Sequence, residues 1–585
     1  MSNSTPQKNK FSAAIATIVI CVVLAVGAVA ISLLSPGSEF EIVPSTAKPG
    51  EVHFSEMRYE RPDHKALIEK MDELINMIND GRSFTEQSRA FTVINEDLAS
   101  FKTMLSLAEI HYYGDTTNEF YKTESDFLNQ AYIEIYDKIC VLLDTIESSS
   151  VKVNYERSFF GNNYFDDWTP MTKSPAALEL LKTEQALISD YQDNLSNAFV
   201  TYNGEDVYVT AEALLALSEA DRSAVIELYY QKYNELLGNI YAELIKTRLA
   251  LAEELGTDYV SYAYESFDRD YTPTEANAYL DSVVSKLIPI ISTIEYDPSP
   301  LNTNTETITS FYALSLAANK MGDDTKEAFD YMVEYGLYDL TASDNKMGIS
   351  FELFLEKYNS PFIFVSSNGT ANDFLTYAHE FGHFVYDYVN LGEGQTVDST
   401  EIASQAMAYI MPLYSDGMGD ISGEDFLKSS IYSTFNTYLY SCFINKFETA
   451  VYSLTPDEVN VEKLNELAKK AALEVGINEQ AASSLASSWF EIQHIYVAPM
   501  YYVSYAISND VALQILEAEL DNPGEGGVKA LEELLSKDHA LPLYESLENQ
   551  GFVSPFSEGR AEKIAELINK IFNPEETSSE NSVAA

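Results

Sequence analysis

The chain carries the sequence HEFGH at residues 379–383, and this stretch decides which fold is expected. On an α-helix His379 and His383 are four positions apart, so their imidazoles project from one face about 6 Å from each other and can share one tetrahedral ion. Glu380 is one step round the helix, where it can take a proton from a water held by that ion. The stretch therefore predicts a helix with two zinc ligands and a general base.

A third ligand is expected further along the chain. Glu401 lies eighteen residues beyond His383, at the start of an apolar run with helical character, and Glu393 is an alternative within a Gly-Glu-Gly turn. A ligand on a packed helix is held more rigidly than one on a glycine turn, which favours Glu401. The extended histidine motif of the metzincins is excluded, because Tyr386 and Val389 occupy its glycine and histidine positions.

A strand is predicted immediately before this helix, at residues 361–366. Its sequence PFIFVS is aromatic and β-branched, and the turn-forming pair Asn368-Gly369 follows it. Thr370 with Asp373 three residues later is a capping-box pattern and predicts the helix start. The strand is either a buried connection or an edge strand with which an extended peptide could pair, and the sequence leaves both open.

Elsewhere the apolar residues recur with the period of an α-helix. One stripe runs over residues 67–78 and ends at Gly81, and another runs over residues 237–255 and ends at Gly256. There is no obvious repeat, and no low-complexity linker divides the chain. We predict a mainly α fold in which residues 51–573 form one large helical domain with a small β-element beside the HEFGH helix.

The N-terminal residues have the composition of an export segment. Residues 11–34 are uncharged and mainly apolar, about 36 Å long as a helix, and residues 1–10 before them include Lys8 and Lys10. This pattern predicts a transmembrane anchor with residues 1–10 in the cytoplasm and the catalytic domain outside it. A signal peptide cleaved after Ala30, giving a secreted protein, is the alternative.

The remaining composition sets broad limits on function. With 91 acidic against 36 basic residues, the net charge of -55 would repel phosphates, so we expect no nucleic-acid partner. Residues 35–50 read as a linker, and residues 574–585 as a disordered acidic tail. Three cysteines make no disulfide framework; at most Cys140 and Cys442 could pair, and nothing in the sequence indicates that they do.

Three stretches together resemble the metal core of the oligoendopeptidase F and thimet oligopeptidase family. They are SNGTAND at residues 367–373, TYAHEFGH at 376–383 and TEIAS at 400–404. A looser resemblance extends from about residue 203 to about residue 508. It implies a mostly helical fold with a deep substrate channel, one Zn²⁺ per chain and endopeptidase action on short peptides. Oligopeptides are the expected partners, and the oligomeric state is not readable.

The resemblance also implies a second group of functional residues on a C-terminal segment. In the family a histidine and nearby tyrosines face the zinc and stabilise the transition state. The matching residues here are His494, Tyr502 and Tyr505, with Tyr501 as a reserve candidate because the spacing is ambiguous by one residue. Tyr502 and Tyr505 are three apart and share a helical face, which suits two phenols meeting one oxyanion.

The chain departs from the family pattern at two positions. Tyr386 stands where a further histidine is usual, and Ala408 where a second glutamate is usual. Groups at such positions commonly support metal ligands, and their loss costs about 10 to 100-fold in affinity or activity. The expected function is a zinc endopeptidase. The alternatives are another glutamate-liganded zinc peptidase, such as an aminopeptidase, and a membrane-anchored peptide-binding protein with impaired catalysis.

Overall fold

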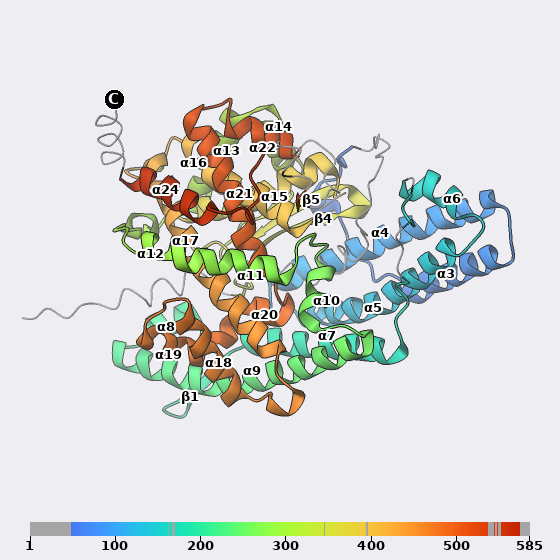
Figure 1. Cartoon of the computed structure of the whole chain (residues 1–585), viewed down its shortest axis with the longest axis horizontal. Coiled ribbons are helices and arrows are strands. Elements are labelled where there is room, and N and C mark those ends of the chain that lie inside the picture. Colours follow the sequence, from blue (N-terminus) through green and yellow to red (C-terminus); the bar gives the residue numbers. More distant parts are fainter. Residues whose placement is uncertain are drawn as a thin grey trace, which may run out of the picture.

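Most of the described chain is α-helical, so the predicted fold class is confirmed (Figure 1). The computed structural model describes residues 48–573 apart from 162, 167–169, 344, 393–395, 536–542, 545–546 and 548–550. The expected N-terminal segment, most of the linker and the acidic tail lie outside these residues.

Three long N-terminal helices form an arm with its own apolar core. They are α3 (His64–Asn79), α4 (Phe84–Gly114) and α5 (Glu119–Glu147), and Figure 1 shows them extending to one side with the short α6 (Lys152–Tyr155). The predicted stripe lies on α3, where Leu67, Met71 and Leu74 are buried in this core. Its apolar spacing matches the helical period, so one face of α3 packs and the other is solvated.

A larger body contains the remaining helices. The 37-residue α9 (Glu219–Leu255) carries the second predicted stripe and ends at Gly256, whose φ of 75° is the left-handed conformation that glycine adopts most readily. Besides the helices that carry the candidate site, the body contains α7 (Pro175–Ser196), α8 (Ala211–Ala216), α10 (Tyr259–Ser266), α11 (Pro273–Ser282), α12 (Ile288–Ile291), α13 (Thr307–Met321), α14 (Asp323–Tyr335), α18 (Val461–Glu474), α19 (Glu479–Ser488), α22 (Gly527–Leu535) and α24 (Arg560–Phe572).

Two small sheets accompany the helices. A hairpin joins β1 (Phe199–Tyr202) to β2 (Glu205–Tyr208). The second sheet has the order β3 (Tyr338–Asp339), β5 (Ser360–Val365), β4 (Ser350–Leu355), with β3 parallel and β4 antiparallel to β5. All of β5 is buried.

The predicted strand before the HEFGH helix is therefore present as β5, but it is the central strand of its sheet. It pairs with β3 on one side and with β4 on the other, so its backbone groups are already hydrogen-bonded within the protein. The buried-connection alternative is correct, and the edge-strand alternative is wrong for this segment.

The HEFGH helix, α15 (Asp373–Asn390), begins later than the capping-box pattern predicts. Asn372 precedes it with helical backbone angles and without a side-chain cap. The Asp373 carboxylate instead accepts hydrogen bonds from the backbone N–H groups of Asn368, Gly369 and Thr370, at 3.0, 2.9 and 3.3 Å. The acid thus makes one half of the box, by accepting the Thr370 N–H, and the same carboxylate fixes the turn between β5 and α15.

The expectation of a transmembrane helix, a membrane partner and a single-pass membrane localisation is corrected. Within the part of the chain that the structure describes, no helix combines the length and the apolar character that a bilayer requires. The longest helix of the described part, α9, carries charged residues along its length, among them Lys232, Glu243 and Arg248. Segment 11–34, which prompted the expectation, lies outside the described residues.

Candidate metal centre

The two histidines of the motif lie on one face of α15, as their spacing predicts. Their ring centroids are 5.1 Å apart, and both side chains remain slightly exposed, at 14% for His379 and 15% for His383. The rest of this face of α15 is buried against β4, β5 and neighbouring helices. The imidazoles therefore stand at the surface of a rigid helix whose packing fixes their direction.

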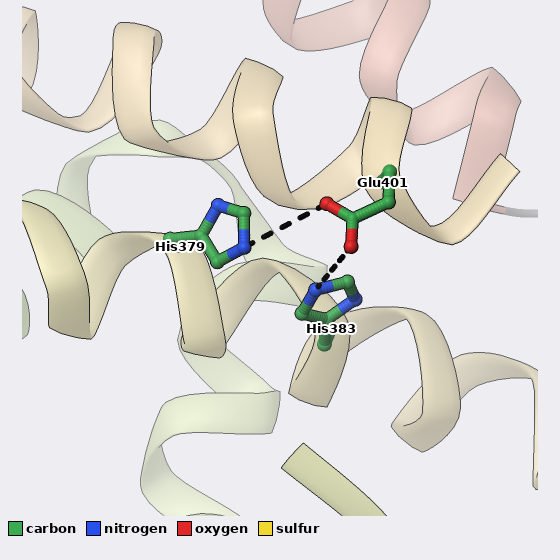
Figure 2. A group of neighbouring side chains, drawn as sticks. All are labelled: His379, His383 and Glu401. Carbon is green, nitrogen blue, oxygen red and sulfur yellow. Dashed lines mark ion pairs between the residues drawn. The ribbon is translucent and has the colours of Figure 1, made fainter. Parts of the chain in front are cut away.

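Glu401 approaches the two histidines from a second helix, α16 (Val397–Tyr414). One carboxylate oxygen lies 3.8 Å from Nε2 of His379 and the other lies 4.0 Å from Nε2 of His383 (Figure 2). One ligand atom from each of the three residues can be chosen so that all lie within 4.8 Å of one another. The arrangement is that of three ligands converging on one point from two helices.

Gly382 permits this approach of α16 to α15. A Cβ atom at this position would lie 2.5 Å from the Cα of Ser404 and 3.0 Å from both the Ala403 carbonyl oxygen and the Met407 Cβ. Two of these neighbours are backbone atoms of α16, which no side-chain rotation can move. The glycine of HEFGH therefore sets the distance between the helix with the imidazoles and the helix with the carboxylate.

Replacement of Gly382 by alanine should destabilise the protein, although alanine normally favours a helix over glycine by about 1 kcal/mol. Overpacking against backbone costs about 1 to 3 kcal/mol, so we expect a net loss in the free energy of unfolding and weaker metal binding. Urea unfolding and metal titration would measure both. Gly348→Ala is a matched control, because a Cβ there has nothing within 4 Å. Equal results for the two variants would contradict this role of Gly382.

Burial sets the protonation of the site. It lowers the pKa of His379 to about 4, and it lowers the pKa of His383 well below its usual value, with a further contribution from His379. Both imidazoles are therefore neutral at pH 7, the form that binds metals. Their short distances to Glu401 are accordingly not those of ordinary ion pairs.

The pKa values of the two carboxyl groups, Glu401 and Glu380, are raised, whereas those of the histidines are lowered. Burial raises the pKa of Glu401 to about 7, while hydrogen bonds from Tyr501 and Ser404 act to lower it. Burial, then the nearby Glu401 charge, raises the pKa of Glu380 well above its usual range. Glu380 is 2% exposed, so its carboxyl group is held in a largely dry position beside the ligands.

The segment with His494 and the three tyrosines contacts this centre through Tyr501. The Tyr501 hydroxyl donates a hydrogen bond of 2.7 Å to Oε1 of Glu401. His494 lies on α20 (Gln493–Val497), and its Nε2 is 3.3 Å from the hydroxyl of Tyr505 on α21 (Tyr502–Asp521). The Tyr502 ring packs edge-on against His494 with 4.3 Å between centroids. The structure thus gathers all four side chains into one cluster.

Tyr501 is the tyrosine that bonds the candidate ligand, and sequence reasoning held it only in reserve. The helical-face argument favours Tyr502 and Tyr505 because they are three residues apart. Tyr501 immediately precedes the first residue of α21 with helical backbone angles, and it lies four residues before Tyr505, so these two tyrosines also share a face. Spacing alone therefore fits either tyrosine, and the packing of α21 against α16 decides which one meets Glu401.

Tyr386 and Ala408, the two residues that depart from the family pattern, lie on different helices and differ in burial. Tyr386 is fully buried within α15, one turn beyond His383, where its ring belongs to the main core. Ala408 is partly buried on α16.

Glu393, the alternative third ligand, lies outside the described residues. Cys140 and Cys442 are both buried as free thiols, so they do not pair.

The sequence analysis did not predict a pair of buried acidic residues, Glu352 and Asp387. Glu352 on β4 hydrogen-bonds Asp387 on α15, and burial raises the pKa of both, that of Asp387 to about 7. Two buried carboxyl groups in contact avoid repulsion when one keeps its proton. The available sign was an acid within each of two otherwise apolar stretches, SFELFL and FVYDYV.

Comparisons with known proteins agree with this fold. Residues 54–174 match the family model described as Peptidase M3 N-terminal domain. A search of curated proteins finds no match to this sequence.

Three solved structures show the same fold. One described as an oligoendopeptidase F is 22% identical over 89% of this chain and 99% of its own, with a TM-score of 0.75. PZ peptidase A, solved with an inhibitor, is 21% identical over 89% and 99%, with a TM-score of 0.76. Oligoendopeptidase-F from Enterococcus faecium is 15% identical over 88% and 99%, with a TM-score of 0.54. At these identities the structures establish the fold alone.

The match to the M3 N-terminal domain, together with the shared fold, supports a peptidase of the metallopeptidase type. The resemblance indicated by the sequence is therefore confirmed by the fold, which is that of the oligoendopeptidase F structures, and by the match of residues 54–174 to the M3 N-terminal domain.

Proposed function

We propose that this protein is a zinc-dependent endopeptidase that hydrolyses short peptides. The observation that carries the proposal is the convergence of His379, His383 and Glu401 on one point, with Glu380 beside them. Two imidazoles and one carboxylate are the ligand set of several catalytic zinc peptidases, in which a fourth position stays open for water or substrate.

The distances fit one tetrahedral ion. Ligand atoms about 2.0 to 2.2 Å from a shared zinc are separated from each other by roughly 3.3 to 3.6 Å. The shortest Nε2 to oxygen distances, 3.8 and 4.0 Å, go to different oxygens of Glu401, and one ligand atom from each residue lies within 4.8 Å of the others, so the three side chains would close around a bound ion to reach that range. The neutral imidazoles present lone pairs without losing a proton first, and a cation would favour the ionised form of Glu401.

A zinc ion at this point would supply Lewis acidity, which lowers the pKa of water and polarises a peptide carbonyl. Glu380 is the base that removes the proton from the attacking water, and it returns that proton to the leaving amine. Its burial supports this role, because a carboxyl with a raised pKa accepts a proton more readily than an exposed one. Both carboxylate oxygens of Glu401 face the histidines (Figure 2). Glu380 is therefore the carboxyl group that remains available to take up and return the proton.

The tyrosine and histidine cluster is proposed to stabilise the oxyanion that forms at the scissile carbonyl. Tyr505, Tyr502 and His494 can donate hydrogen bonds to it, each worth on the order of 3 kcal/mol in a preorganised site. Tyr501 supports the centre differently, because its hydroxyl is bonded to Glu401 and orients that ligand. The deep channel implied by the family resemblance would admit extended short peptides.

Removal of zinc should abolish cleavage of an N-terminally acetylated peptide pool. Treatment with a strong chelator is expected to lower turnover to background, and addition of one equivalent of Zn²⁺ should restore it. Mass spectrometry of the products would map the cleaved bonds. A mock-treated sample passed through the same desalting step controls for losses in handling.

The outcomes separate the candidate functions. Internal cleavage of blocked peptides supports an endopeptidase, whereas release of single residues from unblocked peptides alone would indicate an aminopeptidase. Zinc bound at one per chain without turnover of any peptide would favour the peptide-binding alternative that Tyr386 and Ala408 suggest. Turnover that survives complete metal removal would contradict the proposal.

A further inference from the structure

The turn that leads into Tyr501 adopts a strained backbone conformation. Residues 498–501 form a turn closed by a 3.1 Å hydrogen bond from the Tyr501 N–H to the Ala498 carbonyl. Pro499 and Met500 are its central residues, and Met500 has a φ of 64°. This is the position at which a turn starting with proline favours glycine. A left-handed non-glycine residue costs about 1 to 3 kcal/mol and persists only where its surroundings enforce it.

Two ionisable side chains, Glu448 and Arg269, enforce it by hydrogen bonds to the peptide groups on either side of Met500. Glu448 on α17 (Gly423–Tyr452) accepts the Met500 N–H with both carboxylate oxygens, at 3.0 and 3.1 Å. Arg269, in the loop after α10, donates through Nη2 to the Met500 carbonyl at 3.0 Å. The peptide groups on both sides of Met500 are therefore held by side chains from distant parts of the sequence.

Arg269 makes a second contact on the same segment. Its Nη2 also donates to Oγ of Ser504 at 2.8 Å. Met500 immediately precedes Tyr501 and Ser504 immediately precedes Tyr505, so one guanidinium holds the residue before each of these tyrosines. It thereby links the tyrosine that bonds Glu401 to the tyrosine that contacts His494.

The surroundings of Arg269 keep its charge in place. Its guanidinium lies over the rings of Tyr264 and Phe267, at 4.5 and 4.7 Å from their centroids. Burial acts to lower the pKa of Arg269, but nearby acidic groups, among them Asp398 in the first turn of α16, outweigh it and raise that pKa. Neither Nε nor Nη1 has a hydrogen-bond partner, so Nη2 and the ring contacts determine where the side chain sits.

We infer that Arg269 is a positioning residue for catalysis, which holds Tyr501 against Glu401 and Tyr505 against His494. Arg269 does not itself reach the ligands; it acts through the turn at Met500 and the first turn of α21. The inference rests on the proposed function, because it assigns a role to residues that would support zinc and the oxyanion.

The test compares Arg269→Gln with the wild-type enzyme by two measurements. With zinc saturating, we expect kcat to fall about 10 to 100-fold with little change in KM. The Kd of the apo-protein for Zn²⁺, from competition with a chelating dye, should rise about 10-fold because Tyr501 no longer supports Glu401. The Kd does not depend on turnover, so it tests Arg269 even if the wild type cleaves no peptide, an outcome that would refute the proposed function separately.

Adding Arg269→Gln to a variant that already lacks both tyrosine hydroxyls distinguishes positioning from general structural damage. When Tyr501 and Tyr505 are both phenylalanine, adding Arg269→Gln should change kcat and Kd by less than about threefold, since its targets are already gone. Full multiplicative losses in that background would overturn the inference.

Arg560→Gln is the matched control, because Arg560 is another buried arginine bonded to α21, at 2.6 Å from Asp510. It should lower stability but leave kcat unchanged, and a loss equal to that of Arg269→Gln would also overturn the inference. Should Arg269→Gln fail to fold, Ser504→Ala removes one of the two contacts without removing the charge. A several-fold lower kcat is expected for Ser504→Ala, and an unchanged kcat would contradict the role of this contact.

Discussion

Glu380→Gln should retain one zinc per chain and lose peptide cleavage by about 10²- to 10⁴-fold in kcat, the usual contribution of a general base. Glutamine has nearly the same shape as glutamate, so the buried position can accommodate it, but an amide cannot take a proton from water. Because Glu380 lies beside the ligands and is not one of the three converging groups, zinc stoichiometry should not change. Metal analysis and steady-state kinetics on the same preparation would measure both quantities.

Glu109→Gln makes the same chemical change at a buried acid outside the centre. Burial raises the pKa of Glu109 on α4 to about 7, and the residue accepts a hydrogen bond from Asn129. An unchanged kcat in this control would show that loss of a buried carboxyl group does not by itself inactivate the enzyme. Full activity of Glu380→Gln would remove Glu380 from the role of base.

Glu401→Ala should lose the zinc ion, and cleavage with it. Supporting residues around a metal contribute about 10 to 100-fold in affinity, and loss of a ligand itself is expected to exceed that range. Two imidazoles on one helix would remain, without the carboxylate that α16 brings to them. Zinc content after dialysis and Kd from dye competition would measure the loss.

Tyr501→Phe provides the graded comparison for Glu401→Ala. It removes the 2.7 Å hydrogen bond to Glu401 and leaves the ligand in place, so affinity should fall within the 10 to 100-fold range. The informative result is which variant binds zinc more weakly, and we expect Glu401→Ala to bind it more weakly than Tyr501→Phe. Unchanged zinc stoichiometry in Glu401→Ala would mean that another residue, such as Glu393, provides the third ligand.

Local sequence patterns were sufficient for the features with short-range causes. The four-residue spacing of His379 and His383 places both on one helical face whatever surrounds the helix. The stripe at residues 67–78 predicts α3, and the run PFIFVS predicts β5 to within one residue. In each case the periodicity of a single element contains the information.

Partners that come from distant elements were not predictable in this way. Whether β5 is an edge or a central strand depends on β3 and β4, which approach it from other parts of the chain. The choice of Tyr501 over Tyr502 for contact with Glu401 depends on where α21 begins and on how it meets α16. Composition alone also gave the expectation of a membrane localisation, which is corrected because no helix in the described part of the chain is long and apolar enough to cross a bilayer.

The sequence by itself therefore determined the mainly helical fold, the helix that carries the histidines and the acid that lies beside them, since these follow from residue spacing within single segments. Only the tertiary structure decided that α16 approaches α15 at Gly382 closely enough for Glu401 to face both imidazoles. It also decided that Arg269 and Glu448 hold a strained turn opposite that centre. The contacts of the turn join residues 52 and 231 positions apart, and in each case packing of whole elements brings the partners together.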